Sequence, residues 1–115
     1  MAIRDGIVLR ICTGHACGRR WRELDEALRA LLEARGLTAE VGIAHQPCFG
    51  RCALGPNIVV ERWRGGHRND KAMLAMAMGA KHPDMRFEHG VAPADLPELV
   101  SWHLDAWRRS REASD

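Results

Sequence analysis

The chain has 115 residues, of which 46% are hydrophobic and 28% charged, and its formal net charge is +2. This composition predicts one globular domain over residues 1–115, and so small a net charge gives no general case for nucleic-acid binding. No run approaches the roughly 18 apolar residues of a membrane span, and the first residues lack the apolar stretch of a signal peptide. We therefore expect a soluble, cytoplasmic protein without membrane or nucleic-acid partners.

The first third of the chain predicts a strand followed by a helix. Residues 6–12 are mostly β-branched or apolar, which favours a buried strand that ends at Cys12. From about Arg20, apolar residues recur every three or four positions, which predicts an amphipathic helix with Gly36 as its C-terminal cap. Because this helix begins just after Cys17, the partial positive charge of its N-terminus is directed toward the preceding loop.

Two further strands are predicted around the centre of the chain. Residues 40–44 form a weaker apolar run, and residues 57–63 form a stronger one. Between them lies a loop that contains Gly50, Gly55 and Pro56. Because a helix joins the first strand to the second, we expect those two strands to be parallel. The pattern predicts an α/β fold with helices packed on a sheet.

Residues 64–89 contain a short predicted helix and an edge strand. Asn69 or Asp70 is suited to cap a helix over 71–78, and Gly79 would close it. The methionines of this helix are expected to fill gaps in the packing or to cover a partner surface. Residues 85–89 alternate in polarity, which predicts a fourth strand.

A long amphipathic helix is predicted to end the chain. It begins near Pro93, and Pro97 removes one backbone hydrogen bond, so we expect an irregular first turn. His103 lies on the apolar stripe, where it is expected to be a core or rim histidine with a hydrogen-bond partner. The other residues of the stripe are Leu96, Leu99, Val100, Leu104 and Trp107.

The chain has four cysteines, which occur as two pairs. Cys12 and Cys17 have the spacing C-x4-C, and Cys48 and Cys52 have the spacing C-x3-C. Disulfides are rare in the cytoplasm, so metal binding or redox chemistry explains these residues better than covalent cross-linking does. Neither pair is the C-x-x-C of thioredoxins, and the chain lacks the C-x4-C-x2-C run of plant-type ferredoxins.

A [2Fe-2S] cluster needs four thiolates, two on each iron atom, and two loops with one cysteine pair each meet that need. An interaction module stabilised by zinc on the four cysteines is the alternative, although structural zinc sites usually have tighter C-x2-C spacings. A thiol redox sensor, with a reversible disulfide inside either pair, also remains open. His15 and His45 lie near the cysteines in sequence, and we expect them to tune a cluster by hydrogen bonds rather than to bind it.

The two cysteine motifs resemble a known family. Residues 11–17, Ile-Cys-Thr-Gly-His-Ala-Cys, are similar to the first cysteine motif of the thioredoxin-like iron–sulfur subunit of NADH:quinone oxidoreductase. Residues 48–56, Cys-Phe-Gly-Arg-Cys-Ala-Leu-Gly-Pro, followed by an apolar strand, resemble the second motif of that subunit. They are equally similar to the motif of the free-standing, Shethna-type [2Fe-2S] ferredoxins. Residues 90–100 resemble the entry to the family's final helix.

This resemblance implies a thioredoxin-like fold, with a mixed four-stranded sheet and flanking helices. It also implies that a [2Fe-2S] cluster is bound by four ligands, Cys12, Cys17, Cys48 and Cys52. The implied activity is one-electron transfer, as a free-standing ferredoxin or as a subunit of a redox complex, rather than enzymatic catalysis. Free-standing members tend to be homodimers. Residues 64–89 are longer than the family's corresponding segment, so we expect them to be an insertion atypical of the family.

Arg19 and Arg51 lie beside the expected ligands. Positive charge at the edge of a cluster attracts negatively charged surfaces in a salt-dependent manner. We therefore expect redox protein partners that are acidic where they meet this chain.

Overall fold

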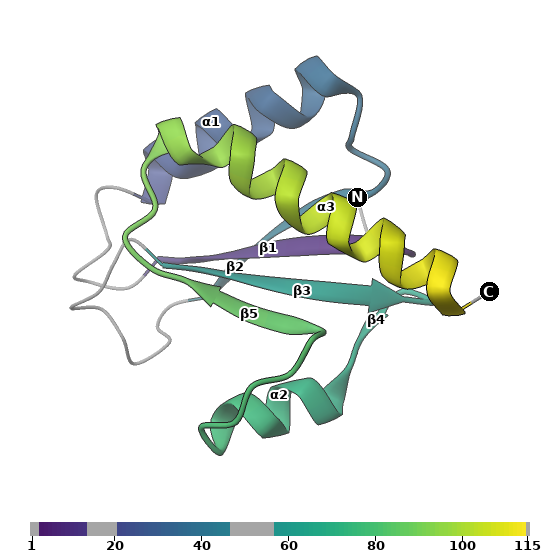
Figure 1. Cartoon of the computed structure of the whole chain (residues 1–115). Helices are drawn as coiled ribbons and strands as arrows, with labels where there is room; N and C mark the ends of the chain where they lie inside the picture. Colours follow the sequence, from purple (N-terminus) through teal and green to yellow (C-terminus); the bar gives the residue numbers. More distant parts are fainter. Residues whose placement is uncertain (1–2, 14–20, 47–56, 115) are drawn as a thin grey trace.

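The computed structural model describes residues 3–13, 21–46 and 57–114 of the chain. Within them, a mixed sheet carries helices on both of its faces (Figure 1). The strands are β1 (Gly6–Cys12), β2 (Val41–Gln46), β3 (Ile58–Arg64), β4 (His67–Arg68) and β5 (Met85–Glu88). The helices are α1 (Trp21–Arg35), α2 (Asp70–Ala77) and α3 (Leu96–Ser114), with a 3₁₀ turn, η2 (Pro93–Asp95), before α3.

The sheet contains the four expected strands and a fifth, β4, which has only two residues. The strand order is β2-β1-β3-β4, and β5 also pairs with β3. As predicted from the helical crossover, β1 and β2 are parallel. The pairs that β3 forms with β1, β4 and β5 are antiparallel. The sequence pattern did not predict β4, because a two-residue strand next to Gly65 and Gly66 has no periodicity to detect.

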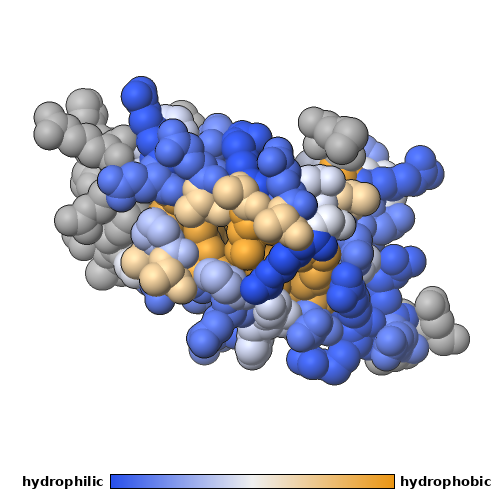
Figure 2. Space-filling model, turned by 90° about the horizontal axis from the view of Figure 1, so that it is seen from above, coloured by the Kyte–Doolittle hydropathy of each residue, from blue (hydrophilic) through white to orange (hydrophobic). Residues whose placement is uncertain are grey.

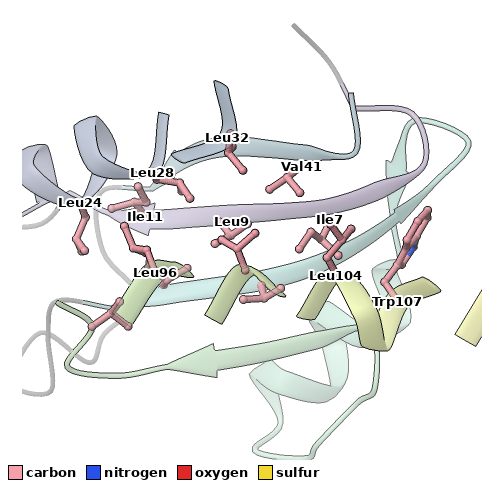
Figure 3. Packing of buried hydrophobic residues seen from close by; sticks show 14 residues of the cluster. Ile7, Leu9, Ile11, Leu24, Leu28, Leu32, Val41, Leu96, Leu104 and Trp107 are labelled. Atoms are coloured by element: carbon pink, nitrogen blue, oxygen red, sulfur yellow. The ribbon is translucent and has the colours of Figure 1, made fainter. Parts of the chain in front are cut away.

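The main hydrophobic core lies between the sheet and the helices α1 and α3 (Figure 3). Alternate residues of β1 point into this core, because successive side chains of a strand face opposite sides of the sheet. The predicted stripe of α1 packs against them, and α1 ends where expected, with Gly36 in the left-handed region at φ 66°. The core residues labelled in Figure 3 are Ile7, Leu9, Ile11, Leu24, Leu28, Leu32, Val41, Leu96, Leu104 and Trp107.

The opposite face of the sheet is covered in part by α2 (Figure 1). Ala72 packs there against Val59 and Met85 in a second, smaller core. The predicted caps are both present. The side chain of Asn69 accepts a hydrogen bond from the backbone N–H of Lys71, and Gly79 follows the helix at φ 80°.

The start of the last helix is irregular, as Pro93 and Pro97 predict. Residues 93–95 form the 3₁₀ turn η2, and the backbone N–H of Ala92 donates to a carboxylate oxygen of Asp95 at 2.9 Å. Helix α3 then runs with its apolar stripe toward the sheet. The buried His103 is hydrogen-bonded to Glu88, which confirms that it is a core or rim histidine with a partner.

The surface over α1 and α3 is mainly hydrophilic, with an apolar strip along its middle (Figure 2). In the described ranges, no helix is both long and apolar enough to span a membrane. The large hydrophobic side chains that are most exposed among the described residues belong to α2, its C-cap and α3: Met73, Leu74, Met78 and Trp102.

Candidate metal centre

Three strand ends meet at one edge of the sheet. Strand β1 ends at Cys12, the parallel strand β2 ends at Gln46, and these two residues are register partners. The antiparallel strand β3 begins at the same edge, and the backbone N–H of Cys12 donates to the carbonyl oxygen of Asn57 at 3.1 Å. The N–H of Thr13 donates to the carbonyl oxygen of Gln46 at 2.7 Å. Backbone hydrogen bonds therefore hold these three chain segments together beside Cys12.

Both cysteine motifs adjoin this edge in sequence. Residues 14–20 follow Thr13 and precede Trp21, where α1 begins at the same end of the molecule (Figure 1). Residues 47–56 follow Gln46 and precede Asn57. Three of the four expected ligands, Cys17, Cys48 and Cys52, lie in these two ranges and thus outside the described residues. The residues next to these two ranges, Thr13, Gln46 and Asn57, are therefore held together at one edge of the sheet.

Cys12 is the expected ligand whose surroundings are described. It is 1% exposed, so its thiol lies among packed atoms rather than in water. By the alternation of the strand, its side chain lies on the same face of the sheet as that of Arg10, and opposite to the face on which Ile11 enters the main core. Cys12 therefore lies at the border between the sheet and the two motif-bearing ranges.

A buried carboxylate lies on the same face of the sheet as Cys12. Glu61 is 1% exposed and accepts hydrogen bonds from Arg10 at 3.1 and 3.2 Å. Arg68 and the indole N–H of Trp63 donate to it at 3.3 and 3.2 Å. These four hydrogen bonds compensate the carboxylate of Glu61 for the water that it loses on burial, which would otherwise be costly. The arginines outnumber the carboxylate, so this cluster contributes net positive charge to the face that carries Cys12.

His45, which the sequence singled out, lies close to the end of β2. One ring nitrogen of His45 is 2.8 Å from a carboxylate oxygen of Asp25, and its ring lies 5.2 Å from that of Trp21. Burial acts to raise the pKa of Asp25, but hydrogen bonds from Arg29 and His45 outweigh it and hold that pKa below the ordinary value. The carboxylate of Asp25 thus stays ionised, and it orients the ring of His45 at the sheet edge that contains Cys12. His15 lies outside the described residues.

Sequence patterns missed a second polar pair at this end. Asn57 is fully buried, and its side-chain oxygen lies 3.0 Å from a ring nitrogen of His89, whose ring stacks against Phe87. Asn57 lies just before β3 and His89 just after β5, and the two become neighbours only because these strands pair. Since 32 residues separate Asn57 from His89, no local spacing links them.

The donor set fits an iron–sulfur centre. The four cysteines of the chain match the four thiolates that a [2Fe-2S] cluster requires, and Cys12 is in a buried position at the meeting point of three strands. Among the described residues, no group of three or more His, Cys, Asp or Glu side chains could bind a metal ion. All four ligands, Cys12, Cys17, Cys48 and Cys52, remain a prediction.

The structure is similar to solved thioredoxin-like [2Fe-2S] ferredoxins from Aquifex aeolicus. The wild-type crystal structure matches with a TM-score of 0.62 and 21% sequence identity, over 89% of this chain and 88% of that chain. A second structure matches with a TM-score of 0.61 and 22% identity, over 87% and 81% of the two chains. A cysteine-to-serine variant gives a TM-score of 0.60 and 21% identity, over 85% and 86%.

These similarities establish the fold of the chain. The expected thioredoxin-like α/β architecture is confirmed, because the match extends over most of both chains. No protein-family model and no curated protein matches the sequence. The prediction that residues 64–89 are an addition to the family's fold stays a prediction.

Proposed function

We propose that this protein is a one-electron carrier that holds a [2Fe-2S] cluster through Cys12, Cys17, Cys48 and Cys52. The observation that supports this most is the meeting of β1, β2 and β3 at Cys12, which places the described flanks of both cysteine motifs at one edge. Cys48 is two residues beyond Gln46, and two residues of chain span at most about 7 Å. The second motif is therefore within reach of the first. When bound, such a cluster accepts and donates single electrons.

The described residues are suited to support an anionic centre. The hydrogen bonds of Cys12 and Thr13 to neighbouring strands hold the first ligand in place, so little reorganisation accompanies a change of charge. Helices α1 and α3 begin at this end of the molecule (Figure 1), and helix N-termini carry partial positive charge that favours nearby anions. The Arg10–Glu61–Arg68 cluster adds net positive charge on the face of Cys12.

Anaerobic purification tests the proposal directly. We expect a coloured protein with about two iron and two sulfide per chain, as the stoichiometry of a [2Fe-2S] cluster requires, and a paramagnetic signal after one-electron reduction. A colourless protein without sulfide would refute the proposal. About one zinc per chain without sulfide would identify the zinc-stabilised interaction module instead. Metal-free protein with a reversible disulfide would identify a thiol sensor.

Single substitutions test the ligand set. Cys48→Ala is expected to abolish cluster assembly, because it removes one of four thiolates. Arg51→Ala is expected to retain the cluster and to change its reduction potential or its rate of reaction with a partner. A normal cluster in the Cys48→Ala protein would show that the ligand assignment is wrong.

Partners, assembly and location form a second part of the proposal. We propose that acidic redox proteins exchange electrons with this chain in the cytoplasm, steered by Arg19 and Arg51 beside the ligands. The reaction rate with such a partner should fall as ionic strength rises. We further propose a homodimer, by analogy with free-standing ferredoxins, either of a stand-alone carrier or of a complex subunit. Sedimentation equilibrium at micromolar concentration distinguishes a dimer from a monomer.

A further inference from the structure

A cleft of about 600 Å³ opens between α3 and the segment that joins α2 to β5. Its apolar lining includes Ile7 and Val60 from the main core and Met85 from the second core, so the cleft extends around the strand β5. The volume is in the range of small-molecule sites, which are mostly apolar clefts with a few convergent polar groups. The expected cluster ligands do not contribute to it, since Cys12 does not line the cleft and the other three lie outside the described residues.

The charged residues that line the cleft are all cationic. They are Arg62, Lys81 and Arg86, and no described carboxylate lines it. Two of them have acidic neighbours, at separations longer than the roughly 2.7–2.9 Å of a strong charge-assisted hydrogen bond. Arg62 is 3.8 Å from Asp84, and Arg86 is 3.4 Å from Glu88.

These arginines therefore retain donors for a ligand, since a guanidinium carries five N–H groups. Lys81 is exposed and forms no ion pair with the described residues. Residues 64–86 have five Lys or Arg and two Asp, which is a net charge of +3 against +2 for the whole chain. Two of these five cations, Lys81 and Arg86, line the cleft.

Trp102 and two histidines, His82 and His103, also line the cleft. Trp102 is 53% exposed, and the guanidinium of Arg86 lies 5.0 Å from its ring centroid. Nδ1 of His82 accepts a hydrogen bond from the backbone N–H of Asp84. The proton of this ring is then on Nε2, which can donate a hydrogen bond to a ligand. The rings of His103 and Trp102 meet edge to face, with centroids 4.8 Å apart. Exposed indole surface beside arginine favours a flat, negatively charged ligand.

We propose that this cleft binds a small organic anion with a planar aromatic body. The aromatic part would lie against Trp102 on the side of the sheet that carries Ile7 and Val60, and the anionic group would contact Arg86 and Lys81. The competing apolar surface on α2, around Leu74, offers no comparable enclosure, because Leu74 is 62% exposed and does not line the cleft.

Calorimetric titration with three probes separates the two parts of this recognition. Flavin mononucleotide has a planar ring system and a phosphate, riboflavin has the same ring system without the charge, and inorganic phosphate has the charge without the ring. With the full chain at its native metal content, we expect 1:1 binding of flavin mononucleotide. Riboflavin should bind at least about tenfold more weakly than flavin mononucleotide, because it lacks the charge-assisted contact of the phosphate. Inorganic phosphate should not bind measurably, because it lacks the aromatic ring.

Variants with matched controls place the site. Arg86→Ala and Trp102→Ala should each weaken binding of flavin mononucleotide by about tenfold. Lys81→Ala should weaken it too, and this exposed side chain can be removed without disturbing the fold. Arg111→Ala is the control, because Arg111 lies over another tryptophan, Trp107, at 4.9 Å and does not line the cleft. Its affinity should stay within about twofold of wild type, a difference below about 0.5 kcal/mol.

Several results would overturn the proposal. One is that flavin mononucleotide does not bind, and another is that riboflavin binds with the same affinity as flavin mononucleotide. A third is that Arg111→Ala and Arg86→Ala lower the affinity for flavin mononucleotide equally. A loss confined to Leu74→Ser would place the ligand on α2 instead and would also refute it. Because the cleft contains no cysteine, a wild-type protein without a cluster would contradict the electron-carrier proposal while leaving these titrations interpretable.

Discussion

The buried carboxylate of Glu61 allows a stringent test of the energetics of this fold. Glu61→Ala would remove the acceptor of hydrogen bonds from Arg10, Arg68 and Trp63. Removing one partner of a buried ion pair costs about 3–5 kcal/mol, because the remaining charges lose their compensation. The side chains of Arg10 and Arg68 are 18% and 31% exposed, so water partly solvates them after the substitution. We therefore expect the free energy of unfolding to fall by about 3 kcal/mol, the lower end of this range.

Urea unfolding followed by circular dichroism, at matched metal content, measures this loss. For a domain of this size it corresponds to a fall in melting temperature of about 12 °C. Glu26→Ala is the control, because Glu26 is exposed on α1 and should change stability by less than about 0.5 kcal/mol. In a double-mutant cycle, Arg10→Ala should couple to Glu61→Ala by about 1 kcal/mol or more. A Glu61→Ala loss below about 1 kcal/mol would refute the reasoning.

Three further predictions concern packing, capping and pH. Gly6→Ala should destabilise the protein by about 1–3 kcal/mol in urea unfolding, because the new Cβ would lie 1.9 Å from the carbonyl oxygen of Glu40. Asn69→Ala should cost about 1 kcal/mol in the same assay, because the backbone N–H of Lys71 loses its acceptor. Burial lowers the pKa of His103 below 6.5, although its bond to Glu88 opposes this, so the unfolded chain binds the proton more readily. Stability should therefore fall as the pH drops below about 6.5, and His103→Gln should flatten this dependence.

Each of these predictions has a distinct contrary result. If the Gly6→Ala protein is as stable as wild type, the backbone of Glu40 is not in close contact with Gly6. An unchanged Asn69→Ala protein would show that α2 does not depend on its cap. A pH profile that is the same in wild type and His103→Gln would mean that another group controls the acid side of the stability curve.

The secondary structure was largely predictable because its signals are local. The stripe of α1 and the glycine at its end are within one stretch of chain, and Gly36 has the expected positive φ. The cap of α2 by Asn69 was equally readable. The burial of Glu61 was not, because its register places it beside Arg10, 51 residues away. A glutamate in a strand pattern reads as a solvent-facing residue unless the strand order is known.

The same distinction applies to the two sites. The cysteine pairs, their spacing and the expected cluster followed from the residues themselves, since the requirement for four thiolates is chemical rather than geometric. The cationic cleft did not, because Arg62, Arg86 and Trp102 belong to a strand, an edge strand and a helix that are far apart in the chain. Their basic and aromatic character was visible, but not their proximity.

The sequence by itself determined most of the turns, helices and strands, and it predicted which cysteines bind an iron–sulfur cluster. Only the tertiary structure decided that Cys12, Gln46 and Asn57 meet at one edge and that a cationic cleft with an aromatic wall opens beside α3. The physical reason is that hydrophobic periodicity reports which face of an element is buried. It does not report which other element buries that face, because strand order and register are set by the packing of the whole chain.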